Sequence, residues 1–166
     1  MKAAGIILAV AVAITLQSTL SRLLTRGAFA VDLVLVVVIS VALTTGPVTG
    51  LLTGTFAGLI QDSLASGLIG IGGLAKTVVG FLAGIIGTQF IVATTLPRFV
   101  VFFAGTVLHA AIFMGLYALL DLRHFGAPYT AVAGQAVANA VIGVVAFHVM
   151  DLLPGAAERR RLRLRR

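Results

Sequence analysis

The stretch 46-GPVTGLLTGTFAGLIQD-62 decides the fold of this chain. Glycine stands at every fourth position, and the next step of four reaches an aspartate: Gly46, Gly50, Gly54, Gly58 and Asp62. Four residues of helix turn by about 400°, so the four glycines stay near one face, where a second helix can approach closely. We call these four glycines the glycine strip. The strip predicts tight helix packing inside a membrane.

Composition points to the same class. The chain has 166 residues, of which 60% are hydrophobic and 10% charged, and its mean hydropathy is +1.14. Such a chain cannot cover itself with a polar surface, which excludes a soluble protein. We expect one all-α, polytopic membrane domain over residues 1–157 and a basic tail over residues 158–166. Without cysteine, disulfides, thiol nucleophiles and cysteine metal sites are excluded.

The apolar runs predict about six transmembrane segments. Proline suits the first turn of a helix and disrupts a continuing one, so Pro47 divides the long run after Val31 into two short segments. Those two segments are shorter than the hydrocarbon thickness and are expected to be tilted or partly re-entrant. The expected segments are 3–20, 31–45, 47–62, 74–94, 99–120 and 131–153. Arg22 and Arg26 fit poorly in a cleavage region, so we expect the first segment to be retained rather than cleaved as a signal peptide.

Basic residues predict the orientation. Six arginines follow the last apolar segment and hold that end in the cytoplasm: Arg159, Arg160, Arg161, Arg163, Arg165 and Arg166. With six segments the N-terminus is cytoplasmic too, and Lys2 and Arg98 join the inner side. The basic residues expected outside are Arg22, Arg26, Lys76 and Arg123. A five-segment alternative would place Lys2 outside, against the tendency of lysine and arginine to stay on the cytoplasmic side.

The arginine tail has two interpretations. It fixes the topology, or in addition it contacts anionic lipid headgroups or an acidic cytoplasmic partner. The tail has no aromatic side chains on which bases could stack and no folded domain that could recognise them, so nucleic-acid binding is not expected.

Two acidic residues lie at segment ends. Asp62, with Gln61 before it, is interpreted either as a cap of the following turn or as one end of a contact with a partner helix. Lys76 is a candidate counter-charge for Asp62. Asp32 opens the second segment and is expected to cap that helix.

Polar residues inside the segments predict hydrogen bonds between helices. His109 lies in the middle of the fifth segment, where structural bonding is favoured over proton relay because no carboxylate is within helical reach. Gln135 and Asn139 form a pair four residues apart in the sixth segment. The sequence has no nucleophile motif, phosphate loop or metal-ligand spacing, so we expect neither enzymatic activity, nor a metal site, nor a cofactor.

Several of these stretches resemble the rod shape-determining protein MreD family. The resemblance rests on 32-DLVL-35 opening an apolar span, 58-GLIQD-62, 67-GLIG-70 and 80-GFLAG-84, together with length, segment number and basic end. Val31 stands where that family usually has a proline.

The resemblance implies a non-catalytic scaffold in the bacterial inner membrane. Such a protein associates with the bitopic scaffold MreC and, through it, with the transpeptidase and glycosyltransferase that build peptidoglycan during elongation. The glycine strip would then receive the partner's helix, with Gln61 and Asp62 at one end of the contact. The alternative is a substrate-binding module of an energy-coupling vitamin or nutrient transporter, a family that resembles this chain in size and apparent fold. Few polar side chains converge here, which favours the scaffold.

Overall fold

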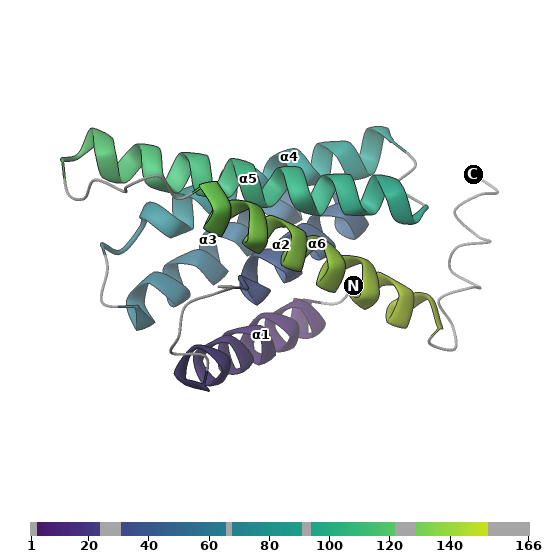
Figure 1. Cartoon of the computed structure of the whole chain (residues 1–166). Coiled ribbons are helices and arrows are strands. Elements are labelled where there is room, and N and C mark those ends of the chain that lie inside the picture. Colours follow the sequence, from purple (N-terminus) through teal and green to yellow (C-terminus); the bar gives the residue numbers. More distant parts are fainter. Residues whose placement is uncertain (1–2, 24–30, 66–67, 91–93, 122–128, 153–166) are drawn as a thin grey trace.

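The computed structural model is all-helical (Figure 1). It describes residues 3–23, 31–65, 68–90, 94–121 and 129–152. Within these ranges the helices are α1 (Ala3–Leu23), α2 (Leu33–Thr45), α3 (Pro47–Leu64), α4 (Ile71–Gln89), α5 (Thr95–Leu119) and α6 (Tyr129–Leu152). Each expected segment corresponds to one helix, and the arginine tail lies outside the described residues.

Length and hydropathy together divide the six described helices into two groups. Four helices of the described chain, α1, α4, α5 and α6, are long and apolar enough to cross a membrane. The 13-residue α2 is apolar but would rise only about 20 Å. The expected shortness of the second segment is therefore confirmed, and α3 is not among the four spanning candidates.

The turn between α2 and α3 is tight. Gly46 ends α2 and precedes α3 with a φ of 98°, a backbone conformation that side-chain-bearing residues rarely adopt. Pro47 is the first residue of α3, where its missing N–H costs nothing. The fifth helix starts earlier than the expected residue 99, because Pro97 lies in the first turn of α5, which begins at Thr95.

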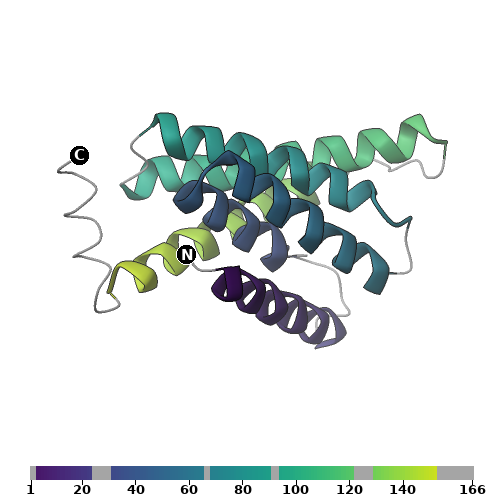
Figure 2. The same ribbon diagram turned by 180° about the vertical axis from the view of Figure 1, so that it is seen from behind.

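The core is built around α2. This helix contacts each of the other five described helices, and α1 covers it from one side (Figures 1 and 2). A helix without charged residues on any face belongs inside a bundle, and the hydroxyls of α2 bond to carbonyls of the same helix: Ser40, Thr44 and Thr45. Its fully buried side chains include Val34, Leu35, Val38 and Ile39.

Two groups of buried side chains meet at α2. The larger group joins it to α4, α5 and α6 through Val79, Phe102 and Phe147, with the rings of the two phenylalanines edge to face. The smaller group joins it to α1 and α3 through Val10 and Ala57. The bundle is thereby packed on both sides of one short central helix.

Candidate functional site

The start of α2 carries a buried carboxylate. Asp32 is 5% exposed, and its Oδ1 accepts a hydrogen bond of 2.9 Å from the backbone N–H of Leu35. It therefore caps α2, as expected from its position before the apolar run. Only one carboxylate oxygen is used in this way, which leaves Oδ2 for a second partner.

That second partner is Lys76 on α4. The distance from Lys76 Nζ to Asp32 Oδ2 is 2.8 Å, and the two side chains are 4% and 7% exposed. The candidate pairing of Lys76 with Asp62 is therefore wrong. Lys76 also cannot count among the basic residues outside the membrane, because its ammonium group is inside the bundle.

His109 on α5 completes the charged centre. Its Nε2 lies 3.2 Å from Lys76 Nζ. A lysine ammonium group only donates hydrogen bonds, so Nε2 must accept, which requires a neutral imidazole with its proton on Nδ1. His109 is thus bonded to another helix, as expected. Its partner is Lys76, which the sequence had suggested as a counter-charge for Asp62.

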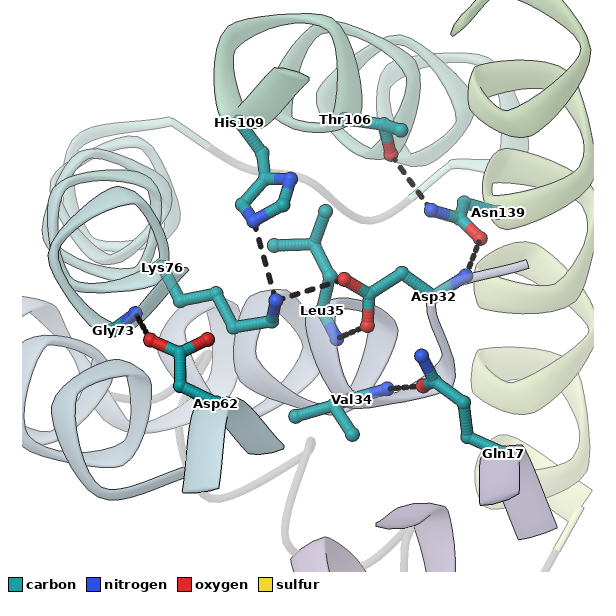
Figure 3. A network of polar contacts seen from close by, with 10 residues as sticks. All are labelled: Gln17, Asp32, Val34, Leu35, Asp62, Gly73, Lys76, Thr106, His109 and Asn139. Carbon is teal, nitrogen blue, oxygen red and sulfur yellow. Dashed lines mark hydrogen bonds and ion pairs between the residues drawn. The ribbon is translucent and has the colours of Figure 1, made fainter. Parts of the chain in front are cut away.

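Amide side chains extend these contacts to the remaining helices. Asn139 Oδ1 on α6 accepts from the backbone N–H of Asp32 at 3.0 Å, and its Nδ2 donates to Thr106 Oγ1 on α5 at 3.2 Å. From α1, Gln17 Oε1 accepts from the backbone N–H of Val34 at 3.2 Å. Figure 3 shows these side chains converging on the first turn of α2. The polar network is defined as Gln17, Asp32, Lys76, Thr106, His109 and Asn139.

The polar network is well suited to holding helices together. It joins α1, α4, α5 and α6 to the start of α2, and the charge of Lys76 is balanced by that of Asp32. Burying an unpaired charge would cost several kcal/mol, about 3–5 when one partner of a buried pair is removed. Across the described residues no three histidine, cysteine or acidic side chains gather as metal ligands.

The glycine strip packs against α4 of the same chain. A Cβ added at Gly54 would lie 2.7 Å from the carbonyl carbon of Lys76, and one at Gly50 would overlap a backbone oxygen. The backbones of α3 and α4 can approach this closely only because side chains are missing. The contacts pair Gly50 with Gly80, Gly54 with Lys76 and Gly58 with Gly73.

This arrangement corrects the expectation that the glycine strip receives a partner's helix, because α4 already covers Gly50, Gly54 and Gly58. The fourth glycine, Gly46, forms the turn before α3, where its carbonyl carbon lies beside Gly84 of α4. Close helix docking was therefore the right inference from the spacing, but its occupant lies within the chain.

Asp62 acts as a cap. Its Oδ2 accepts from the backbone N–H groups of Gly70 at 2.9 Å and Gly73 at 3.0 Å, at the start of α4. Of the two interpretations offered for Asp62, the structure shows the cap. The neighbouring Gln61 has a buried Oε1 atom with no hydrogen-bond partner in the described part of the chain.

The structure separates the expected polar pair Gln135 and Asn139. Gln135 is half-buried on α6, one turn before Asn139, and is outside the polar network. Spacing alone had grouped the two, yet Asn139 is fully buried and bonded on both sides of its amide. Thr106 was not identified from the sequence. The only sequence feature that could have indicated its role is a hydroxyl group one helical turn before His109.

A hollow lies at the other end of α2. It has a volume of about 500 Å³ and is lined by Leu43, Thr44, Thr45, Gly46, Thr49, Gly87 and Thr88. The hydroxyls of Thr44, Thr45 and Thr88 bond to carbonyls of their own helices. The hollow presents no charged side chain, so the charged chemistry of the described residues around α2 is concentrated at the polar network.

The bundle of apolar helices, with an ion pair sealed inside it, defines a polytopic helical membrane protein. The family model of the rod shape-determining protein MreD matches residues 2–153. The chain therefore belongs to the MreD family, as the resemblance of its motifs indicated, and its family role is in rod shape determination. Comparisons with curated proteins and with solved structures gave no match.

Proposed function

We propose that this protein is a non-catalytic membrane scaffold of the bacterial cell-elongation complex. It docks the transmembrane helix of MreC and supports the enzymes of peptidoglycan synthesis, namely the elongation transpeptidase and glycosyltransferase. The observation that carries the proposal is the family match over residues 2–153. The polar network supports a holding role, because its charged groups are engaged with one another inside the bundle.

A partner helix has to bind an outward surface, because α4 occupies the glycine strip. The outer side of α3 is one such surface, and it exposes apolar side chains at intervals of four residues: Val48, Leu52, Phe56, Ile60 and Leu64. The outer sides of α1, α5 and α6 are apolar too. Lipid or protein can cover surfaces of this kind, so the experiment has to map the contact directly.

The proposed location is the bacterial inner membrane with both termini in the cytoplasm. The ion pair between Arg98 and Asp151, 3.0 Å long, joins the start of α5 to the end of α6, on the side where the arginine tail follows. Basic residues on that side support a cytoplasmic placement. There the tail also contacts anionic lipid or an acidic partner.

The test is purification of the tagged full chain from its native membrane in mild detergent, followed by mass spectrometry. Recovery of MreC with peptidoglycan enzymes supports the scaffold. Recovery of transporter ATPases with a membrane coupling subunit overturns it in favour of the transporter alternative. Photo-crosslinking from Phe56 and, as a comparison, from Val141 on α6 then identifies the surface that MreC contacts.

A further inference from the structure

The contact between α3 and α4 contains a repeat. The glycine strip advances by four residues along α3, and α4 carries Gly80 and Gly84 at the same interval. In the observed register Gly50 meets Gly80, and Gly84 meets Pro47 at the start of α3. Moving α4 by four residues, about 6 Å, would bring Gly84 to Gly50 and Gly80 to Gly54. The glycine positions of the α3–α4 contact by themselves therefore accommodate two registers.

Polar contacts distinguish the two registers. Thr55 and Thr77 hydroxyls lie 2.8 Å apart across the α3–α4 contact, but this pair is neutral and half-buried. The Asp62 carboxylate that caps α4 is also half-buried, so water can replace its bonds. The ion pair between Asp32 and Lys76 is different, because both side chains are at least nine-tenths buried.

Asp32 supplies a reference point outside the repeating contact. It belongs to the start of α2, where Leu35 bonds its carboxylate and Asn139 bonds its backbone N–H. A four-residue shift of α4 would carry the Lys76 backbone about 6 Å along the helix axis, away from Asp32. The Asp32 carboxylate would then be buried without a partner, which is strongly unfavourable. Lys76 would move to the place of Gly72, beside the half-buried Asp62.

We propose that the Asp32–Lys76 ion pair is a register lock, which determines which turn of α4 packs against which turn of the glycine strip. A polar residue at one position of a repeating helix contact is a known means of specifying register, and sliding by one turn is an established kind of helix movement. His109 supports the lock by accepting a hydrogen bond from the Lys76 ammonium group. This inference is independent of the proposed function.

The chain contains no cysteine, so disulfide crosslinking in membranes can report the register directly. The pair Thr55→Cys and Thr77→Cys reports the observed register. The pair Thr55→Cys and Phe81→Cys reports the register shifted by one turn, because position 81 is one turn beyond position 77. Each pair is combined with Asp32→Asn and Lys76→Met, which remove the lock without leaving a buried charge unpaired.

With the lock present, we expect the 55/77 crosslink to dominate. Without it, the 55/81 crosslink should rise by at least about a hundredfold, since the cost of a buried unpaired charge keeps the shifted register below one per cent while the lock is present. Asp151→Asn is the matched control: it breaks the α5–α6 ion pair and should leave the crosslinks unchanged. If the neutral variant gives the 55/77 crosslink alone, or neither crosslink, the register lock is overturned.

Discussion

Lys76 is the residue on which the charged centre depends. Its ammonium group contacts Asp32 at the start of α2 and His109 on α5, and it is itself held on α4. One flexible side chain thus connects three helices. Because three donors sit on one nitrogen, a lysine can satisfy partners that arrive from different directions.

Replacing Lys76 by methionine should destabilise the folded protein strongly. Lys76→Met keeps a long apolar stem but leaves the Asp32 carboxylate buried and unpaired, at a cost of about 3–5 kcal/mol. The measurement is the fraction of protein that stays folded during heating in detergent. The double variant with Asp32→Asn should lose much less, and an equal loss in both variants would contradict this account.

The role of His109 can be tested by its hydrogen-bonding capacity. His109→Gln keeps an oxygen that accepts from Lys76, whereas His109→Leu removes the acceptor and should cost about 1–3 kcal/mol. We expect the glutamine variant to stay close to wild type in thermal stability and in restoring rod shape to a strain lacking the protein. If the His109→Gln variant keeps its thermal stability but does not restore rod shape, the result would point to proton transfer by His109 instead.

At the scale of elements, α2 and α3 form a helical hairpin in which α2 is buried and α3 has one exposed side. The short α2 is sealed inside the bundle, while α3 is glycine-rich on the side facing α4 and apolar on its outer side. The close α3–α4 contact depends on dispersion between backbones rather than on large side chains. This contact is therefore sensitive to any added side-chain volume.

Gly54→Leu should disrupt the bundle itself. The new side chain would overlap the backbone of Lys76, and overpacking of this kind typically costs about 1–3 kcal/mol or more. We expect a lower thermal unfolding temperature in detergent and loss of the 55/77 crosslink. Gly115→Ala is the control, since no atom lies within 4 Å of its added Cβ, and it should leave both measurements unchanged. Normal stability of the leucine variant, with only partner binding lost, would restore the partner-docking interpretation of the glycine strip.

For the whole molecule, the two ends of the bundle differ in chemistry. The polar network lies at the start of α2, beside the middle of α5, and the threonine-lined hollow lies where α2 finishes. At that second end Arg98 pairs with Asp151 and lies 4.6 Å from the centre of the Phe147 ring. This asymmetry makes the orientation in the membrane a testable property.

Cysteine labelling in intact cells should reveal that orientation. Leu68 and Leu120 are exposed at one end of the bundle, and Leu96 is exposed at the other. With cytoplasmic termini, Leu68→Cys and Leu120→Cys react with a membrane-impermeant maleimide added outside, and Leu96→Cys reacts only after the cells are opened. The reverse pattern would show that the termini face outward.

The sequence by itself determined the class, the six helices and the presence of a tight helix contact. Apolar run length, Pro47 and the spacing of the glycine strip are local properties, and each acts within a few turns of helix. The cap at Asp32 was predictable for the same reason. The motifs around it were also sufficient to indicate the family.

Only the tertiary structure decided which groups meet. Lys76 pairs with Asp32 rather than with Asp62, and α4 rather than a partner's helix covers the glycine strip. Asn139 joins the polar network while Gln135 does not. These outcomes depend on how six helices are arranged around α2, and helix periodicity does not specify which faces meet, because apolar residues surround most of these helices.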